Sequence, residues 1–294
     1  MRTLRLPLRT LRLPSTGSGT SLRQAQATYL SSEKNNQICT FTSMLHISIV
    51  GTGNVAFHLA QAIADCKTLK LVEVVGRNPD VQGFPVNYSK SFNQISETDL
   101  ILIAVADKAI ASVVEQIPNS FHGTVAHTAA SVPLSILNRF ENHGVFYPLQ
   151  TFSKTKELSW NKLPVFLESN TDKAKKHLEI LAEHLQANLY YANSEQRLKL
   201  HLAAVFSCNF VNALFASSEE ILNSENIPFD VLKPLIYETI DKAFSLTPKK
   251  AQTGPALRND QTTMQNHVQA LTDAELRNLY QKLSELIQNQ HGIL

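Results

Sequence analysis

The pattern of apolar and polar residues divides the chain into two parts. Up to residue 191, short runs rich in Val, Ile and Leu alternate with segments whose apolar residues recur every three or four positions. Such runs are typical of strands buried on both faces, and the segments between them are typical of amphipathic helices. Strands that alternate with helices predict a parallel sheet. The predicted strands are 45–50, 69–76, 99–106, 123–127, 144–147, 164–168 and 189–191.

The first predicted strand runs directly into Gly51-x-Gly53-x-x-Ala56, and a helical pattern follows it. A dinucleotide pyrophosphate requires this order, because the first glycine makes a tight turn and the second lets the backbone approach the phosphates. The free N–H groups at the start of the helix attract the anion. The residues expected to bind the cofactor here are Gly51, Thr52, Gly53, Asn54 and Val55.

The end of the second predicted strand indicates which dinucleotide binds. NAD-specific folds have an acidic residue there, which accepts hydrogen bonds from the ribose hydroxyl groups. This chain has Arg77 and Asn78 instead. A guanidinium group pairs with a 2′-phosphate through its planar fork, which favours NADP(H) as the cofactor. The alternative is a solvated arginine in a loop.

The ends of the other predicted strands indicate which residues surround the nicotinamide. Ligands in parallel sheets bind beyond the carboxyl ends of the strands. That rule places Val105 and Ala106, His127 and Thr128, and Gln150 around the nicotinamide. Asp107 is positioned to cap a helix over 108–117, and Ser131 to cap another. A third helix is predicted over 172–186.

From residue 194 onward the apolar period becomes helical throughout. Neither glycine nor proline interrupts residues 195–223, which predicts one helix about 40 Å long. Further helices are expected over 228–243, 258–271 and 273–288, the last opened by a capping box of Thr272 and Glu275. The fold class is therefore α/β: a Rossmann-type parallel sheet domain over 44–191, followed by an all-helical dimerisation domain over 192–294. Such a long helix exposes more apolar surface than its own domain can cover, so we expect a homodimer.

Charge and cysteine content narrow the function classes. Residues 1–43 hold six Lys or Arg and one acid, so the remaining chain carries 21 − 24 = −3. A mildly acidic folded part does not resemble a nucleic-acid-binding surface. The three cysteines lie far apart, without metal-ligand spacing, which favours a reducing cytoplasmic compartment and predicts neither disulfides nor a metal site. With no apolar run of about 18 residues, a membrane span is not expected.

The first 43 residues stand apart from this pattern. The string Arg-Thr-Leu-Arg-Leu-Pro occurs twice, at residues 2 and 9, and a Ser/Thr/Gly-rich stretch follows. An Arg- and Ser-rich, acid-poor composition is typical of an organelle transit peptide. The prolines, however, interrupt the amphipathic helix that such a peptide uses. We therefore favour a disordered or misassigned extension, with Met44 as the natural start.

Several strings together carry a resemblance to a known family. They are Gly51-Thr-Gly-Asn-Val-Ala56, His127-Thr128, Val145-Phe-Tyr-Pro-Leu-Gln-Thr-Phe152, the segment 201–212 and Thr253-Gly-Pro-Ala-Leu-Arg-Asn-Asp260. Over about residues 44–294, the chain resembles the two-domain Rossmann proteins whose C-terminal half is called domain of unknown function 2520. It departs from them at Ala129-Ala130, where the family usually has Ser-Gly or Ala-Gly. More distantly, it is similar to pyrroline-5-carboxylate reductase and the deazaflavin-dependent NADP reductases.

The candidate chemistry lies on few polar side chains. His201 is the first candidate for proton transfer, because its ordinary pKa is close to physiological pH; alternatively, it is a satisfied helix histidine. Asn209 and Asn212 interrupt an apolar helix, so their amides require a partner, either a substrate or the partner domain. Asn209 and His127 are the other catalytic candidates, and the alternative for His127 is a structural role.

Arg258 and Asp260 lie in a polar loop, which is a candidate for substrate contact, although a mutual ion pair or a helix cap would explain them equally. With Gln150 and Asn212 they complete the expected substrate site. By analogy, the resemblance implies an oxidoreductase that transfers a hydride between NADP(H) and a small molecule bound between the two domains. The alternative is a non-catalytic NADP(H)-binding sensor or assembly protein.

Overall fold

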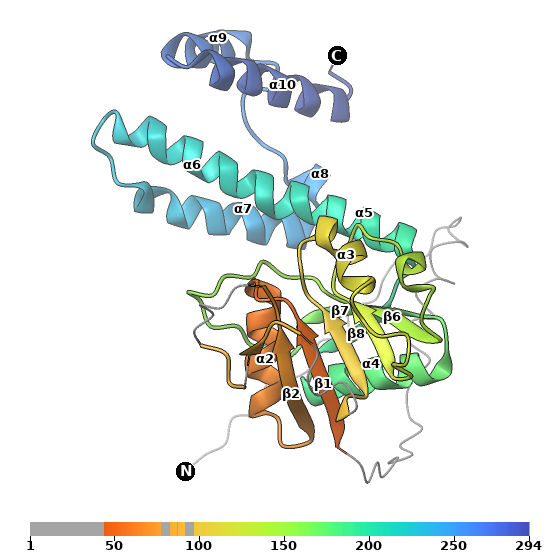
Figure 1. The fold of residues 1–294 in the computed structure, drawn as a ribbon. Coiled ribbons are helices and arrows are strands. Elements are labelled where there is room, and N and C mark those ends of the chain that lie inside the picture. Colours follow the sequence, from red (N-terminus) through yellow and green to blue (C-terminus); the bar gives the residue numbers. More distant parts are fainter. Residues whose placement is uncertain (1–43, 78–82, 87, 92–96, 294) are drawn as a thin grey trace, which may run out of the picture. The chain divides into compact units, whose positions relative to one another are not determined.

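The structure, a computed structural model, describes residues 44–77, 83–86, 88–91 and 97–293. The predictions for residues 1–43 and for Asn78 lie outside this part of the chain. Within it, eight strands form one sheet in the order β3-β2-β1-β4-β5-β6-β7-β8 (Figure 1). Their bounds are β1 Leu45–Val50, β2 Leu69–Val75, β3 Tyr88–Ser89, β4 Leu100–Ile103, β5 Thr124–His127, β6 Asn142–Pro148, β7 Pro164–Ser169 and β8 Asn188–Tyr191.

All neighbouring strands are parallel except β6 and β7, which are antiparallel. The predicted parallel sheet is therefore confirmed except at this pair. Parallel neighbours need a crossover, usually a helix, between them. Residues 149–163, which join β6 to β7, contain no helix. The chain therefore re-enters the sheet at the same end of the strands at which it left β6. The short strand β3 was not predicted.

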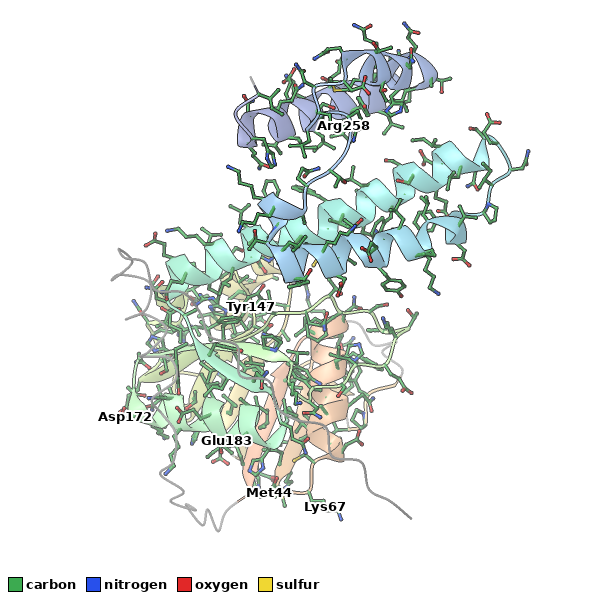
Figure 2. The ribbon with its side chains drawn as sticks, turned by 180° about the vertical axis from the view of Figure 1, so that it is seen from behind. Met44, Lys67, Tyr147, Asp172, Glu183 and Arg258 are labelled. Atoms are coloured by element: carbon green, nitrogen blue, oxygen red, sulfur yellow. The ribbon has the colours of Figure 1, made fainter. Side chains whose placement is uncertain are left out.

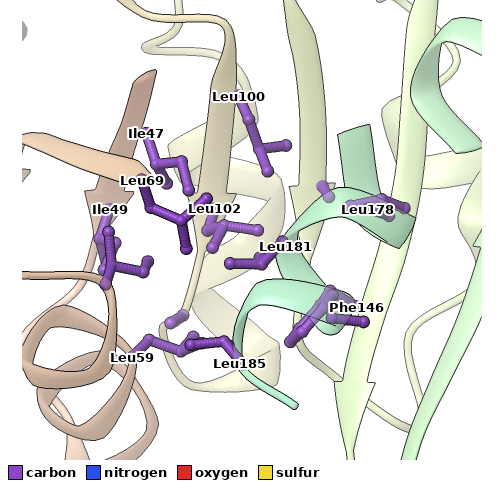
Figure 3. Packing of buried hydrophobic residues seen from close by; sticks show 14 of the residues in the cluster. Ile47, Ile49, Leu59, Leu69, Leu100, Leu102, Phe146, Leu178, Leu181 and Leu185 are labelled. Atoms are coloured by element: carbon purple, nitrogen blue, oxygen red, sulfur yellow. The ribbon is translucent and has the colours of Figure 1, made fainter. Parts of the chain in front are cut away.

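Apolar side chains cover both faces of the sheet. On one face, α2 (Asn54–Asp65) and α4 (Asp172–His184) bury one large cluster. Figure 3 shows Ile47, Leu102 and Phe146 of the strands packed with Leu181 and Leu185 of the α4 segment. On the other face, α3 (Ile110–Val114) covers the alternate residues of β4. Burial on both faces explains why β1 and β4 read as continuous apolar runs.

Two predicted helices differ in the structure. The segment expected to be one helix over 108–117 is a short 3₁₀-helix, η2 (Asp107–Ala109), followed by α3. The helix expected after Ser131 is η3 (Leu134–Leu137), another 3₁₀-helix, preceded by Pro133. Neither predicted cap forms, because the Ser131 hydroxyl donates a hydrogen bond to the Asp107 carboxylate. The two polar residues therefore join two loops at the carboxyl ends of the strands.

The second half is helical, as predicted. One continuous helix spans residues 194–223 as α5 (Ser194–Ala204), a π-helical segment η4 (Val205–Asn209) and α6 (Phe210–Asn223). The helices that follow are η5 Phe229–Leu232, α7 Lys233–Leu246, α8 Pro248–Ala251, α9 Gln261–Ala270 and α10 Ala274–Gln290. The predicted capping box before α10 was wrong: Asp273 caps that helix by accepting from the N–H groups of Glu275 and Leu276.

Candidate functional site

The turn between β1 and α2 can exist only with glycine at its first position. Gly51 has φ = +127°, and a Cβ atom there would lie 2.2 Å from the carbonyl oxygen of Ala104. Its N–H group donates to the carbonyl of Val75 (2.7 Å), which ties the turn to the end of β2. Bulkier residues would therefore separate β1 from β2 and β4, the strands that border the turn.

Gly53 has a different role, because nothing lies within 4 Å of the place where its Cβ would be. It is the N-cap residue of α2 and has no side chain to satisfy the first N–H groups of the helix. The first three N–H groups of an α-helix, here those of Asn54, Val55 and Ala56, have no partner within it. Open space in front of unsatisfied N–H groups fits a pyrophosphate.

A cavity of about 670 Å³ extends from this turn along the carboxyl ends of the strands. It is lined by all the described residues that were predicted to bind cofactor, and by Gln150: Gly51, Thr52, Gly53, Asn54, Val55, Arg77, Val105, Ala106 and Thr128. Among the described residues, its lining also contains Lys90 and Lys108 but no carboxylate. Three cations and no anion among these residues fit a ligand with several phosphate groups.

His127 is completely buried and directly precedes Thr128, which lines this cavity. Its Nδ1 accepts a hydrogen bond from the Ala129 N–H (3.2 Å), while Nε2 has no partner among the described residues. Burial lowers the pKa of His127 to about 4, and the positive charge of Arg197 acts in the same direction; the Pro133 carbonyl and Asp107 oppose them. The ring is therefore neutral at physiological pH. It orders the backbone that follows β5.

The predicted catalytic candidate His201 lies next to a residue that sequence analysis missed. The hydroxyl of Tyr147, near the carboxyl end of β6, is 3.5 Å from Nδ1 of His201 (Tyr147 is labelled in Figure 2). Burial raises the pKa of Tyr147, Arg197 partly opposes this effect, and Asp107 adds to it. The tyrosine consequently keeps its proton at neutral pH and can act as a proton donor.

Arg197, one helical turn before His201, was also missed. Its side chain is fully buried and forms an ion pair with Glu168 of β7. It donates to the backbone carbonyls of Ala129 (3.3 Å) and Val132 (2.7 Å) as well. These contacts fix α5 against the loop that follows His127. The sequence did not predict that Arg197 is buried, since an arginine in the first turn of a helix is usually solvated.

The remaining predicted site residues lie elsewhere. Asn209 and Asn212 line a second cavity, of about 810 Å³, together with Thr151. Asp260 caps α9 by accepting from the N–H of Thr263 (3.1 Å). The hydrogen bond from the Thr263 hydroxyl, and after it this backbone contact, lower the pKa of Asp260. Arg258 is exposed, and neither residue of this loop lines the first cavity.

Comparison with known proteins gives two independent matches. A sequence model of the domain of unknown function DUF2520 matches residues 163–287. The crystal structure of the putative NADP oxidoreductase BF3122 from Bacteroides fragilis is 35% identical, covers 84% of this chain and 98% of its own, and superposes with a TM-score of 0.74. The chain belongs to the DUF2520 family.

The same architecture occurs in more distant structures. A reductive aminase from Aspergillus terreus in complex with NADPH and ethyl-5-oxohexanoate has a TM-score of 0.64 at 15% identity, over 84% of this DUF2520 chain and 95% of its own. The 1-pyrroline-5-carboxylate reductase of Streptococcus pyogenes has a TM-score of 0.55 at 12% identity, over 85% and 99%. At these identities the likeness shows the fold alone. No curated protein is similar in sequence to this DUF2520 protein.

Proposed function

We propose that this protein is an oxidoreductase that transfers a hydride between NADP(H) and a small organic molecule. The cofactor is NADP(H). The observation that carries this function is the cavity beside the glycine turn, whose described lining includes three cations, no carboxylate and the first residues of α2. The Bacteroides fragilis relative, named a putative NADP oxidoreductase, has the same fold at 35% identity. When bound, the cofactor supplies the hydride.

The protein's own residues supply the proton that accompanies hydride transfer to a carbonyl or imine. Tyr147 is the donor, because its buried hydroxyl keeps its proton and points to His201. The exposed imidazole of His201 connects this hydroxyl to solvent, so a proton can return to the hydroxyl after the transfer. Since Thr128 and Gln150 line the cofactor cavity near the ends of β5 and β6, we place the substrate beside these two strands.

Turnover separates this function from the alternative, an NADP(H)-binding sensor. The experiment is to follow NADPH oxidation with a panel of ketones, aldehydes and imines, and in parallel to titrate NADPH by its fluorescence. An enzyme consumes NADPH with at least one class of acceptor, and Tyr147→Phe lowers that rate about 100-fold or more without changing NADPH affinity. Tight binding with no consumption across the panel would favour the sensor. Failure to bind either dinucleotide would refute both.

A homodimer through the helical half is part of the proposal. The long helix carries a stripe of exposed apolar side chains: Leu198, Leu202, Phe206, Phe210 and Leu214. Between 37% and 60% of each is exposed. Four residues of a regular α-helix turn about 40° beyond one revolution, so a stripe of this spacing would drift around the helix. The π-helical segment η4 turns less per residue and offsets part of the drift, which keeps the stripe on one face.

A second copy is a better occupant for this stripe than a membrane. By length and composition alone, the helix at 194–223 could span a bilayer. Its first turns, however, contain the ion pair of Lys199 with Glu195 and the buried Arg197. Placing these charged side chains in the hydrocarbon core of a bilayer would cost free energy. The free cysteines Cys66 and Cys208 agree with the cytoplasmic location that we propose.

Light scattering tests the dimer. The protein should have about twice the mass of one chain at micromolar concentration, and Phe206→Glu should give a monomer because it places a charge in the centre of the apolar stripe. Phe206→Leu, which keeps the stripe apolar, should remain dimeric. A monomeric wild-type protein would refute this part of the proposal.

A further inference from the structure

Lys90, one of the cations that line the cofactor cavity, directly follows β3, a strand of two residues. Val74 of β2 pairs with Tyr88 and Val75 with Ser89, in parallel register. The N–H of Gly76 then donates to the carbonyl of Ser89 (2.9 Å), which extends the ladder by one more bond. Continuation of this register places Lys90 beside the Gly76-Arg77 turn, and both Arg77 and Lys90 line the cavity.

The backbone around Lys90 is fixed on both sides. At Gly76, a Cβ atom would lie 2.8 Å from Cγ2 of Thr52 and 3.1 Å from the Tyr88 ring, so the ring packs where a side chain would otherwise be. After the strand, Ser89 Oγ donates to the carbonyl of Ser91 (2.6 Å) and accepts from the N–H of Ser91 (3.2 Å). This turn holds the main chain of Lys90 while its side chain remains exposed.

Neither cation has a partner among the described residues. Arg77 and Lys90 form no hydrogen bond or ion pair there through their side chains, and the described residues that line the cavity include no carboxylate. Two neighbouring positive charges repel each other unless an anion lies between them. A phosphate monoester carries a charge of about −1.5 to −2 at neutral pH, which two cations can balance.

We propose that Lys90 is the second cation of a 2′-phosphate site, so that the preference for NADP(H) is shared between Arg77 and Lys90. This inference rests on the proposed function, because it requires that the cavity bind a dinucleotide. The guanidinium of Arg77 offers a planar fork to two phosphate oxygens, and the ammonium of Lys90 adds a compact charge from the neighbouring strand. The competing explanation is a solvated surface lysine.

The decisive variant is Lys90→Ala, compared with Lys67→Ala. Both remove one exposed lysine and the same charge, but Lys67 precedes β2, at the opposite end of that strand from the cavity (Figure 2). NADPH should bind Lys90→Ala about 5- to 20-fold more weakly, as expected for the loss of one charge-assisted contact. Its NADH affinity should stay within about twofold of wild type. Lys67→Ala should change neither affinity.

Two further measurements exclude indirect effects. Lys90→Arg should keep most of the NADPH preference, because it keeps a cation at the end of β3. The adenosine half of the cofactor should report the same site: 2′,5′-ADP should lose affinity for Lys90→Ala, whereas 5′-AMP should not. Thermal unfolding of Lys90→Ala should match that of the wild type, since the side chain is exposed.

The outcomes separate this inference from the proposed function. If the wild type prefers NADPH and Lys90→Ala keeps that preference in full, Lys90 is a solvated lysine and the proposed function is unaffected. An equal loss of NADPH and NADH would also overturn the inference, because the lysine would then contact a group that both cofactors share. If the wild type binds neither dinucleotide, the inference and the proposed function both fail.

Discussion

The two glycines of the β1–α2 turn should respond in opposite ways to the same added methyl group. Gly51→Ala places a Cβ 2.2 Å from the Ala104 carbonyl oxygen at a φ of +127°. Gly53→Ala places one where nothing lies within 4 Å, at an ordinary extended φ of −75°. The first methyl group collides with the protein, and the second occupies only the space that we assign to the pyrophosphate.

The expected magnitudes follow from these positions. At Gly51, the unfavourable φ costs about 1–3 kcal/mol and the overlap a similar amount. Together they should lower the melting temperature by on the order of 10 °C, at about 2–4 °C per kcal/mol. At Gly53, alanine is a poorer N-cap than glycine by about 1 kcal/mol or less, and it restricts the unfolded chain by about 0.4–1 kcal/mol. These terms oppose each other, so the melting temperature should change by no more than about 3 °C.

Thermal unfolding and NADPH titration on both variants provide the assay. Gly53→Ala should fold like the wild type but bind NADPH and NADH at least about tenfold more weakly, because the methyl group keeps the phosphates away from the helix N-terminus. Gly51→Ala should lose stability before any ligand is added. The reasoning would be refuted if Gly53→Ala bound NADPH as tightly as the wild type, or if it were destabilised as much as Gly51→Ala.

Three other predictions concern side chains around the cavity. Arg77→Ala should weaken NADPH binding about tenfold or more while leaving the NADH affinity nearly unchanged. Both cofactors are titrated against both proteins, and an NADPH affinity that is the same before and after the mutation would show that Arg77 does not bind the cofactor. Tyr147→Phe should lower kcat about 100-fold or more without raising the Kd of NADPH, as expected for the loss of a proton donor; a kcat within a few-fold of wild type would exclude it as the donor. The third concerns pH: His127 stays neutral when folded down to a pKa of about 4 but takes up a proton near pH 6.5 when unfolded. As the pH is lowered from 6.5 to 4, the free energy of unfolding should therefore decrease by about 1.4 kcal/mol per pH unit more than that of His127→Gln. Denaturant titrations at several pH values measure that difference, and parallel slopes for the two proteins would contradict it.

Much of the fold was predictable because it depends on local patterns. The glycine turn and the strands beside it were found from sequence, since a buried parallel strand reads as an apolar run. The antiparallel β7 was not predictable in this way, because a strand's own residues do not record its direction. The helix caps predicted at Ser131 and Asp107 were wrong for a related reason. Each residue type is common at helix N-caps, but here the two side chains form a hydrogen bond with each other across 24 positions.

The candidate site was predicted where it depends on backbone and missed where it depends on long-range side-chain contacts. Tyr147 lay within a string that resembles the family, but nothing local distinguished its hydroxyl from that of any strand tyrosine. Lys90 could be placed only once β3 was known to pair with β2. Arg197 became significant only with its partner Glu168, 29 positions away.

The reversed direction of β7 determines where the long helix starts. Because β8 runs parallel to β7, it descends from the level of Pro164 and ends at Tyr191, level with Leu167. The chain therefore enters α5 near Glu168, which pairs with Val145, two residues below Tyr147 on β6. From Ser194 the helix rises about 10 Å before it reaches His201. Its first two turns thus act as a spacer, and a residue added or removed between Ser194 and His201 would rotate the histidine by about 100° away from the tyrosine.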